Sequence, residues 1–452
     1  MSLMRTRLLK QTASLLKSTK ASASLRNYGW TRTCERKRLI KVNQGGSLSV
    51  RCLSFECKNG KLVDVEVLEE GRIVLLSGED GLRDRFHSIW LRHNCQSVKS
   101  KQQYSGQKII DVSKVDPDIR IKEIINTDTD TIKIRWQTEQ HITEIPVDLL
   151  VENSYSQSTL DQQSESAKGR LYSQEDVPRM AYWELLEGEM GFTRWLEMIN
   201  EHGLCVLEGV PTEDGMVAEV GERIGPVPLT IYGKVFDVVS TVKPINVAYS
   251  DAELHLHQDL VYYESPPGLQ LLHCVRFDDC VDGGNSTFLD VFHTAEEFRK
   301  KSPKHFEVLT QIPATFQKIH YERESAVHMV YQRPHIVLNH NHEIVGVNWA
   351  PAFEGPLKVK TELVEEYYKA YHLFAKAILE SSNLKQTRLA AGDLVTFNNR
   401  RMLHGRKSFK LNGGVRHLQG CYINIDEYKS RVNYLYQRLK KPVRRVGNQD
   451  WQ

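Results

Sequence analysis

The stretch Glu253-Leu-His-Leu-His-Gln-Asp-Leu260 decides how this sequence is interpreted. In an extended chain, His255, His257 and Asp259 point to one face, and the residues between them point to the other. Two imidazoles and a carboxylate on one face are unfavourable to bury unless they have partners or a ligand. Because side chains two residues apart on a strand can reach the same ion, we predict that His257 and Asp259 are metal ligands.

A third ligand must come from elsewhere in the chain, and we predict that it is His404, in Phe397-Asn-Asn-Arg-Arg-Met-Leu-His-Gly-Arg406. His404 follows a strand-like run, and Gly405 leaves the backbone free to turn there. Two histidines and one carboxylate form a facial triad, which leaves half of an octahedral iron open. Three other histidines are interpreted as surface, supporting or loop residues rather than ligands: His255, His340 and His342.

An arginine follows His404 twelve residues later, in Arg416-His-Leu-Gln-Gly-Cys-Tyr422. On a strand, alternate residues from Arg416 to Tyr422 share a face. A dicarboxylate that chelates a metal at one end needs a cation at its other end, and the planar guanidinium binds a carboxylate through two hydrogen bonds. We therefore predict that Arg416 binds 2-oxoglutarate, with a further hydrogen bond from Ser286. The alternative is an ordinary surface arginine.

Length and composition are those of a soluble globular protein of two or three domains. The 452 residues are 40% hydrophobic and 26% charged, and the formal net charge is +3. This balance gives no reason to expect nucleic acid or an anionic membrane surface as a partner. No apolar run approaches the roughly 18 to 20 residues that span a bilayer. The eight cysteines form no CxxC pair, which is typical of reduced thiols inside cells.

The first residues have the composition of a targeting segment. Residues 1–34 contain no Asp or Glu but seven Lys and Arg, with many Ser and Thr. Leu8, Leu9, Leu15 and Leu16 could share one helical face. This pattern is typical of a mitochondrial transit peptide, so we predict the mitochondrial matrix as the location. The alternatives are a basic tail without function and a cytoplasmic protein.

The chain is predicted to contain two folded parts. After the leader at 1–42, residues 43–155 read as a small β-rich domain with strands at 62–67, 73–76, 131–136 and 142–145. A polar, serine-rich linker follows at 156–177. Residues 178–440 read as a larger α+β domain, and 441–452 as a tail. In the larger domain we predict strands at 268–274, 286–291, 394–397 and 417–423, and a helix over 364–378 whose aromatic stripe faces the core.

These residues resemble one known family, the gamma-butyrobetaine and trimethyllysine dioxygenases of carnitine biosynthesis. The resemblance extends from about Gly60 to Tyr434 and is carried by several ordered motifs besides the metal motif. They are Trp90-Leu-Arg-His-Asn-Cys95, Ile231-Tyr-Gly233, Asn246-Val-Ala-Tyr249, Pro266-Pro-Gly-Leu-Gln-Leu-Leu-His-Cys274, Gly283-Gly-Asn-Ser286, Leu403-His-Gly-Arg406 and Arg416-His-Leu-Gln-Gly-Cys-Tyr422.

The resemblance implies a fold and a chemistry. The larger domain is expected to be a double-stranded β-helix (jelly roll) with the metal triad at its mouth. Iron(II), 2-oxoglutarate and O2 are the implied cofactors, with ascorbate as a reductant, and Leu272 joins Arg416 and Ser286 in contacting 2-oxoglutarate. The reaction is oxidative decarboxylation of 2-oxoglutarate coupled to hydroxylation of an unactivated C–H bond. A homodimer is also implied.

The resemblance further implies an aromatic cage for a trimethylammonium group, which cation–π attraction holds by roughly 0.5 to 2 kcal/mol per contact. The cage positions are Tyr232, Phe236, Tyr249 and Tyr422, with Phe236 in place of a tryptophan, and Asn246 matches a polar residue of the substrate site. The alternative for each aromatic residue is plain core packing. We expect gamma-butyrobetaine, converted to L-carnitine, as the substrate. The alternatives are trimethyllysine, another small metabolite, and a catalytically silent binding protein.

Two departures from the family pattern affect expected sites. Leu260 stands where the butyrobetaine enzymes have a tyrosine, and Ala350 stands where they have an asparagine for the substrate carboxylate. In the small domain, the family's zinc is bound by three cysteines and a histidine. Only two of these ligands are matched here, because the four positions are Cys95, Ser97, Ser100 and His141. A neutral hydroxyl is a poor replacement for a thiolate, so we predict that no zinc binds.

Overall fold

The structure is a computed structural model that describes residues 53–56, 62–78, 81, 83–125, 130–161, 177–239 and 250–441. The predicted leader lies outside the described residues, as do most of the linker and all but the first residue of the tail. The chain divides into two compact units between Val147 and Asp148. Each unit is built around its own sheets, and the domain limits predicted from the sequence remain a prediction.

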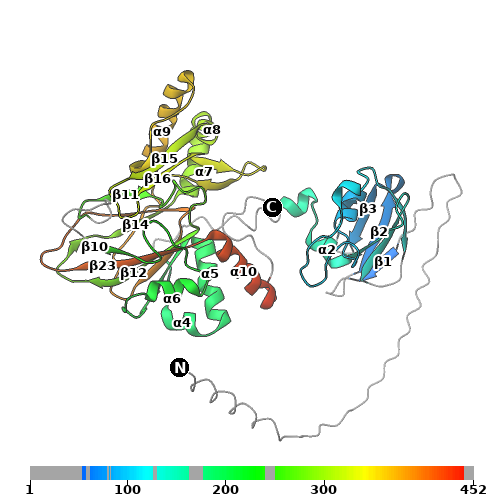
Figure 1. Cartoon of the computed structure of the whole chain (residues 1–452), viewed down its shortest axis with the longest axis horizontal. Helices are drawn as coiled ribbons and strands as arrows, with labels where there is room; N and C mark the ends of the chain where they lie inside the picture. Colours follow the sequence, from blue (N-terminus) through cyan, green and yellow to red (C-terminus); the bar gives the residue numbers. More distant parts are fainter. Residues whose placement is uncertain are drawn as a thin grey trace, which may run out of the picture. The chain divides into compact units, whose positions relative to one another are not determined.

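The smaller unit contains two antiparallel sheets (Figure 1). Strands follow the order β1-β2-β3-β4 in one sheet and β5-β6-β7 in the other. Their bounds are Leu53–Glu56, Leu62–Leu68, Ile73–Gly78, Arg83–His87, Ile121–Ile125, Thr131–Trp136 and Ile142–Pro146. Alternate residues such as Ile132, Ile134 and Trp136 are almost fully buried, as a strand with one face in a core requires. The short helix α1 (Ser88–His93) directly follows β4, and the helix α2 (Val147–Glu152) begins at the last residue of this unit.

The larger unit is built on two facing sheets. The first has six strands in the order β10-β23-β12-β20-β9-β8 and the second has four in the order β11-β21-β14-β19. The strands of the first are Phe236–Val239, Arg416–Ile423, Leu269–Phe277, Leu394–Asn398, Leu204–Glu208 and Arg179–Ala181. Those of the second are Leu254–His257, Met402–Arg406, Ser286–Asp290 and Lys385–Thr387.

The two sheets pack against one another through apolar side chains from both. One buried cluster joins Phe397 and Leu418 of the first sheet with Phe288 and Met402 of the second. Burying apolar side chains between the sheets stabilises the pair by about 25 cal/mol per Å² removed from water. Neighbouring strands in both sheets run antiparallel apart from β8 and β9. This arrangement is the double-stranded β-helix, so the predicted fold class is confirmed.

Helices cover the sheets on two sides (Figure 1). One group packs against the six-stranded sheet and consists of α5 (Glu189–His202), α6 (Met216–Glu222) and α10 (Ile425–Arg438). Short α4 (Tyr182–Leu186) precedes α5. The other group consists of α7 (Val291–Lys301), α8 (Pro303–Gln311) and α9 (Val364–Leu379). None of the helices that the structure describes has the length and apolar character needed to cross a membrane.

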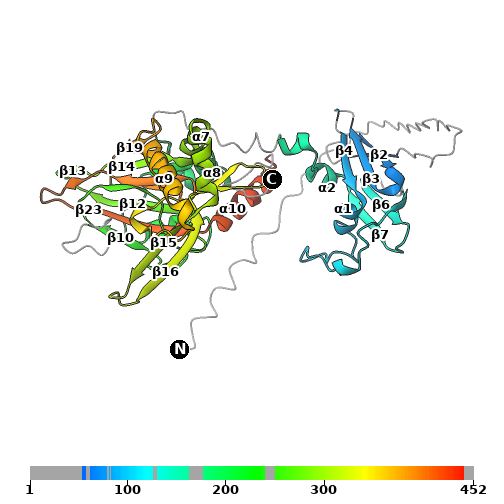
Figure 2. The same ribbon diagram turned by 90° about the horizontal axis from the view of Figure 1, so that it is seen from above.

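Three two-stranded antiparallel sheets complete the larger unit. Two of them are hairpins. The longer hairpin joins β15 (Pro313–His320) to β16 (Val327–Pro334) and lies outside both main sheets (Figure 2), and the shorter joins β17 (Ile336–Leu338) to β18 (Ile344–Val347). The third pairs β13 (Asp282–Gly283) with β22 (Phe409–Lys410), which is distant in sequence. The connection after β18 contains the single turn η4 (Pro351–Phe353). The β15–β16 hairpin and η4 lie outside the main sheets, yet they contribute Lys318 and Phe353 to a cavity that residues of those sheets also line.

The predicted regular elements are largely confirmed. The helix expected over 364–378 is α9, and Tyr367, Phe374 and Ile378 on its stripe are buried. One local expectation is wrong: Gly405 does not provide a turn, because it lies inside strand β21. A Cβ at Gly405 would come within 2.6 Å of the Leu254 carbonyl oxygen and 2.8 Å of Thr287 Oγ1. Glycine is therefore required there by the close approach of β21 to both of its neighbours.

Candidate metal centre

Strand pairing brings the three predicted ligands together. Strands β11 and β21 are neighbours, and His257 pairs directly with His404 across them. Asp259 follows the end of β11, and the next residue, Leu260, has a positive φ of 58°. Side chains that stand opposite one another on adjacent strands are close enough to share a ligand. The register therefore places two imidazoles 147 residues apart in sequence on one site.

The three side chains converge closely enough to bind a single ion. His257 Nε2 lies 3.3 Å from Asp259 Oδ1, and His404 Nε2 lies 3.9 Å from Asp259 Oδ2. The centroids of the two imidazole rings are 4.3 Å apart. Within the described part of the chain, this is the only group of three or more His, Cys, Asp or Glu side chains with such geometry. Two neutral imidazoles and one carboxylate are the donor set of a facial triad, and they fit iron(II).

Neighbouring groups fix the orientation of the ligands. The His255 carbonyl oxygen lies 2.8 Å from His257 Nδ1, which leaves Nε2 directed at the site. Gln270 Nε2 and the Tyr422 hydroxyl each donate to Asp259 Oδ2 at 2.8 Å. Such outer partners hold the ligands in place and tune their basicity. Tyr422 is therefore directly linked to the metal centre, a contact that the sequence did not indicate.

Electrostatics favour the metal-binding forms of Asp259 and His404. At His257 burial opposes protonation, but the hydrogen bond to Asp259 and its charge raise the pKa of the imidazole. Burial opposes ionisation of Asp259, but the hydrogen bond from His257, the nearby His404 and the Tyr422 hydroxyl hold the pKa of Asp259 well below its usual range. Burial, together with repulsion from His257, lowers the pKa of His404 to about 3. An ionised carboxylate and a neutral imidazole are the forms that coordinate a divalent ion. His404 therefore needs no deprotonation at neutral pH.

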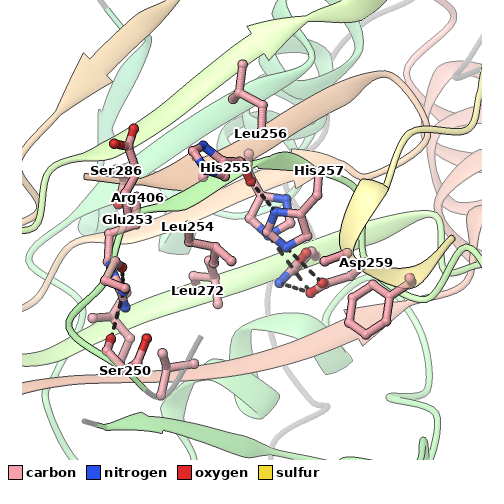
Figure 3. Close-up of a pocket in the computed structure, with 18 of the residues that line it drawn as sticks. Ser250, Glu253, Leu254, His255, Leu256, His257, Asp259, Leu272, Ser286 and Arg406 are labelled. Carbon is pink, nitrogen blue, oxygen red and sulfur yellow. Dashed lines mark hydrogen bonds and ion pairs between the residues drawn. The ribbon is translucent and has the colours of Figure 1, made fainter. Parts of the chain in front are cut away.

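The ligands line a cavity of about 740 Å³, which is the size of a small-molecule site. Figure 3 shows His257 and Asp259 at one end of this pocket and Ser286 and Arg406 at the other, with Leu272 between them. Arg416, the predicted partner of the 2-oxoglutarate carboxylate, lines the same cavity, and its contact with 2-oxoglutarate stays a prediction. Leu272 presents an apolar surface to the stretch between the two ends of the pocket.

Arg416 is a buried guanidinium without an anionic partner among the described residues. Its side chain is only 4% exposed and lines the cavity, and its Nε has no hydrogen-bond partner there. The aromatic rings of Phe277 and Phe409 lie beside it, at 5.3 and 5.6 Å. Burial, helped by repulsion from Arg406, lowers the pKa of Arg416 to about 10. A buried cation without a counter-charge is unfavourable, and an anionic group in the cavity would relieve this cost, so the binding of 2-oxoglutarate by Arg416 remains a prediction. The alternative of an ordinary surface arginine is wrong.

The other arginine in the cavity was not identified as a site residue from the sequence. Arg406 is 5% exposed and donates to the carbonyl oxygens of Ser250 and Ala252. It lies opposite Ser286 across β21 and β14. Its position two residues after His404 on the same strand was the available signal, since alternate strand residues share a face. Through these two hydrogen bonds, Arg406 holds the segment before β11 at the edge of the pocket.

Three of the four expected cage residues lie together, whereas the fourth, Tyr249, and the polar substrate-site residue Asn246 fall outside the described residues. Tyr232, Phe236 and Tyr422 line the cavity. The rings of Phe236 and Tyr422 stack at 5.2 Å, and Tyr232 lies 6.1 Å from Phe236. Asn246 and Tyr249 belong to residues 240–249, which the structure does not describe.

The two positions that depart from the family pattern do not line the cavity. Leu260 is 1% exposed and Ala350 is fully buried, and both belong to the apolar core beside α7 to α9. The positive φ of Leu260 is a conformation that a non-glycine residue rarely adopts. It turns the chain directly after Asp259, so this residue acts on the geometry of the loop that carries a ligand.

The zinc-related positions of the smaller unit also converge, but they form a different kind of cluster. Cys95 Sγ lies 3.3 Å from His141 Nε2 and 3.2 Å from Ser97 Oγ. Ser100 Oγ lies 3.2 Å from the same imidazole nitrogen. Burial opposes ionisation of the thiol, but hydrogen bonds from Ser100 and Ser97 lower the pKa of Cys95 below its ordinary value. These four side chains are hydrogen-bonded to one another.

Comparison with known proteins gives two family matches. The profile described as "Taurine catabolism dioxygenase TauD, TfdA family" matches residues 172–422, and "Gamma-butyrobetaine hydroxylase-like, N-terminal" matches residues 65–151. A gamma-butyrobetaine dioxygenase of Pseudomonas sp. (strain AK-1) is 31% identical over 363 residues, which cover 79% of this chain and 92% of that protein.

Two further relatives are more distant. The mitochondrial trimethyllysine dioxygenase of Bos taurus is 27% identical over 364 residues, covering 78% of this chain and 83% of that protein. The gamma-butyrobetaine dioxygenase of Homo sapiens is 27% identical over 391 residues, covering 83% of this chain and 97% of that protein. The similarity thus extends over both units of the chain.

Proposed function

Because the chain belongs to the TauD, TfdA family of dioxygenases, which use iron(II), 2-oxoglutarate and O2, we propose that it hydroxylates gamma-butyrobetaine to L-carnitine. One observation carries the proposal: a His257–Asp259–His404 cluster and the buried Arg416, which has no anionic partner among the described residues, line the same cavity as the aromatic side chains of Tyr232, Phe236 and Tyr422. The similarity to named gamma-butyrobetaine dioxygenases supports the choice of substrate.

His257, Asp259 and His404 would hold the iron, and their partners keep them in place. When bound, the iron and 2-oxoglutarate supply oxidative decarboxylation to succinate and CO2, coupled to insertion of one oxygen atom into a C–H bond. The protein's own contribution is position and exclusion of water. Gln270 and Tyr422 hold the Asp259 carboxylate by two hydrogen bonds, so its orientation is set before any ligand enters.

The cosubstrate is proposed to bind between the metal and Arg416. Arg416 takes the distal carboxylate through its two-pronged guanidinium, and Ser286, 7% exposed in the same cavity, adds a hydrogen bond. Leu272 contacts the methylene groups. Each hydrogen bond between this carboxylate and a charged group such as Arg416 would stabilise bound 2-oxoglutarate by about 1.5–3 kcal/mol.

The trimethylammonium group is proposed to contact aromatic faces, because its methyl groups cannot accept or donate ordinary hydrogen bonds. Phe236 and Tyr422 form a stacked pair in the cavity, next to Tyr232. Each cation–π contact is worth roughly 0.5 to 2 kcal/mol, depending on how dry the site is. Tyr249 and Asn246 are included in this proposal from the sequence alone.

Trimethyllysine is the second candidate substrate. Relatives named trimethyllysine dioxygenase match the chain with 27% identity, and the same triad and aromatic residues would serve either substrate. A screen with iron(II), 2-oxoglutarate and candidate trimethylammonium compounds separates the two. We expect succinate and a product heavier by one oxygen atom with gamma-butyrobetaine. Product from trimethyllysine alone would replace the proposed substrate, and absence of succinate with every compound would indicate a catalytically silent protein.

Location and assembly are further proposals. The acid-free, Arg- and Lys-containing segment 1–34 supports import into the mitochondrial matrix. Fusion of residues 1–42 to a fluorescent protein tests this, because a cytoplasmic signal contradicts it. The homodimer implied by family resemblance can be tested by light scattering on the purified full chain.

A further inference from the structure

Lys318 is a cavity residue to which neither the sequence motifs nor the proposed chemistry gives a role. It lies on β15, in the hairpin outside the two main sheets (Figure 2). Its side chain lines the same cavity as the metal ligands. Its Nζ lies 5.4 Å from the ring centroid of Phe353, which also lines the cavity. No hydrogen bond or ion pair joins the Lys318 ammonium group to another described residue.

The other basic groups of the cavity are already engaged. Arg406 donates to two backbone carbonyl oxygens, and Arg416 faces the position proposed for the cosubstrate carboxylate. The acidic groups are engaged as well. Asp259 belongs to the metal centre, and Glu253 forms a 2.7 Å ion pair with Lys407. Among the described lining residues, Lys318 therefore has no counter-charge.

The surroundings of Lys318 are positive rather than neutralising. Burial, reinforced by repulsion from Arg323, lowers the pKa of Lys318 below its ordinary value. The guanidinium of Arg323 lies 5.6 Å from the ring centroid of Tyr232, so this ring already has a cation on one face. An anionic ligand group would relieve the unfavourable interaction at this end of the cavity.

A chain of contacting aromatic side chains connects this positive end to the metal centre. Phe353 contacts Tyr262 with a centroid separation of 5.2 Å, and the Tyr262 and Tyr232 hydroxyls are 3.2 Å apart. Tyr232 leads on to Phe236 and Tyr422, whose hydroxyl donates to Asp259. Lys318 and Tyr422 thus stand at the two ends of this series of contacts. Lys318 contributes a cation without a counter-charge, whereas no described Lys or Arg lies over the rings of Phe236 and Tyr422.

We propose that Lys318 binds the carboxylate of the substrate, and that Phe236 and Tyr422 receive the quaternary ammonium group. The proposal rests on the proposed function and specifies its ligand class, a small zwitterion with separated trimethylammonium and carboxylate groups. Ala350 is fully buried and offers no polar group to that carboxylate. The Lys318 ammonium group would instead form an ion pair with the substrate carboxylate.

The test compares two ligands that differ only in this charge, gamma-butyrobetaine and its primary amide. Calorimetry on the full chain with iron(II) and 2-oxoglutarate, without oxygen, measures binding independently of turnover. Lys318→Met should raise the Kd of gamma-butyrobetaine by roughly 10- to 100-fold, as expected for losing a hydrogen bond to a charged group. The Kd of the amide should change by less than about twofold, and Lys318→Arg should restore most of the affinity for the carboxylate.

Lys369→Met is the matched control, because Lys369 is an exposed lysine of α9 that pairs only with Glu365. The proposal is overturned if Lys318→Met weakens both ligands equally, if it weakens neither, or if the wild-type protein does not prefer the carboxylate to the amide. Turnover is measured separately. A wild-type protein that binds gamma-butyrobetaine through Lys318 without hydroxylating it would refute the proposed function and retain the binding role.

Discussion

The described residues of each unit contain a cluster of ligand-type side chains, and the chemistry of the two clusters differs. In the larger unit, two imidazoles and a carboxylate converge within 4.8 Å. In the smaller unit, a thiol, an imidazole and two hydroxyls lie within 3.2 to 3.3 Å of their neighbours. Both clusters are compact and partly buried, so compactness alone does not distinguish a metal centre from a hydrogen-bonded cluster.

The donor types make the difference. A hydroxyl both donates and accepts, so Ser97 and Ser100 can satisfy the thiol and imidazole without any ion. The two histidines and the ionised aspartate of the larger unit cannot satisfy one another's hydrogen-bonding groups and charge to the same extent. Nδ1 of His404 has no hydrogen-bond partner among the described residues, and the Asp259 carboxylate faces both imidazoles. A cation satisfies such a set better than its members satisfy one another.

Removal of one imidazole from the larger unit's cluster should have the largest effect on iron binding and activity. His404→Ala leaves two ligands, so we expect loss of iron binding and of succinate formation. The loss should exceed the roughly 10- to 100-fold effect typical of changing an outer partner of a ligand. His255→Ala is the control, since His255 is exposed and supports His257 through its backbone carbonyl, which the substitution retains. Turnover that survives His404→Ala would refute the metal assignment.

Arg416 tests whether the larger cluster serves a cosubstrate. Arg416→Met should raise the KM for 2-oxoglutarate by roughly 10- to 150-fold, equivalent to the 1.5–3 kcal/mol of a charged hydrogen bond. Arg416→Lys should recover part of this, because it keeps the charge and loses the planar fork. Initial rates at varied 2-oxoglutarate measure the effect. Arg276→Met, which removes a surface arginine paired with Asp278, should leave KM unchanged.

The sequence predicted the triad because its signal is local. His257 and Asp259 are two residues apart, and a strand next to glycine marks His404. The sheet and α9 were likewise predictable from alternation and helical spacing. The role of Gly405 was misjudged because its constraint comes from Leu254 and Thr287 on neighbouring strands. Close approach between strands leaves no pattern in a single sequence.

Contacts across the fold account for what the sequence could not give. The hydrogen bond from Tyr422 to Asp259 joins residues 163 positions apart, and Lys318 reaches the cavity from a hairpin outside the sheets. Tyr422 belongs to a recognised motif, but nothing in that motif indicates its contact with Asp259, and Lys318 belongs to no recognised motif. The positive φ of Leu260 was also not predictable, since leucine carries no turn signal.

The smaller cluster can be converted into a metal site, which would sharpen the comparison. Ser97→Cys together with Ser100→Cys completes three thiols and one imidazole. The present spacings of 3.2 to 3.3 Å approach the roughly 3.3 to 3.8 Å between ligand atoms on tetrahedral zinc. We expect one zinc per chain by elemental analysis. At 100 times Kd, zinc should stabilise the folded state by about 2.7 kcal/mol, measured by denaturation with and without the metal.

Ser97→Ala with Ser100→Ala is the control for that experiment, because it removes the same hydroxyls without adding ligands. This variant should retain no zinc. Stoichiometric zinc in the unaltered protein would contradict the view that hydroxyls satisfy Cys95 and His141, and failure of the double cysteine variant to bind zinc would show that the cluster cannot reach tetrahedral geometry.

The smallest expected effect concerns the hydroxyl that holds the Asp259 carboxylate. Tyr422→Phe removes one of two hydrogen bonds to Oδ2, and the bond from Gln270 remains. We therefore expect iron affinity to fall by about tenfold, the lower end for an outer partner, while the aromatic contact with Phe236 persists. Tyr428→Phe is the matched control, because it removes another buried hydroxyl, which donates to the Leu196 carbonyl oxygen. Iron titration separates the two variants: equal losses would mean that a buried hydroxyl matters only for packing, whereas a loss confined to Tyr422→Phe would locate the effect at the carboxylate.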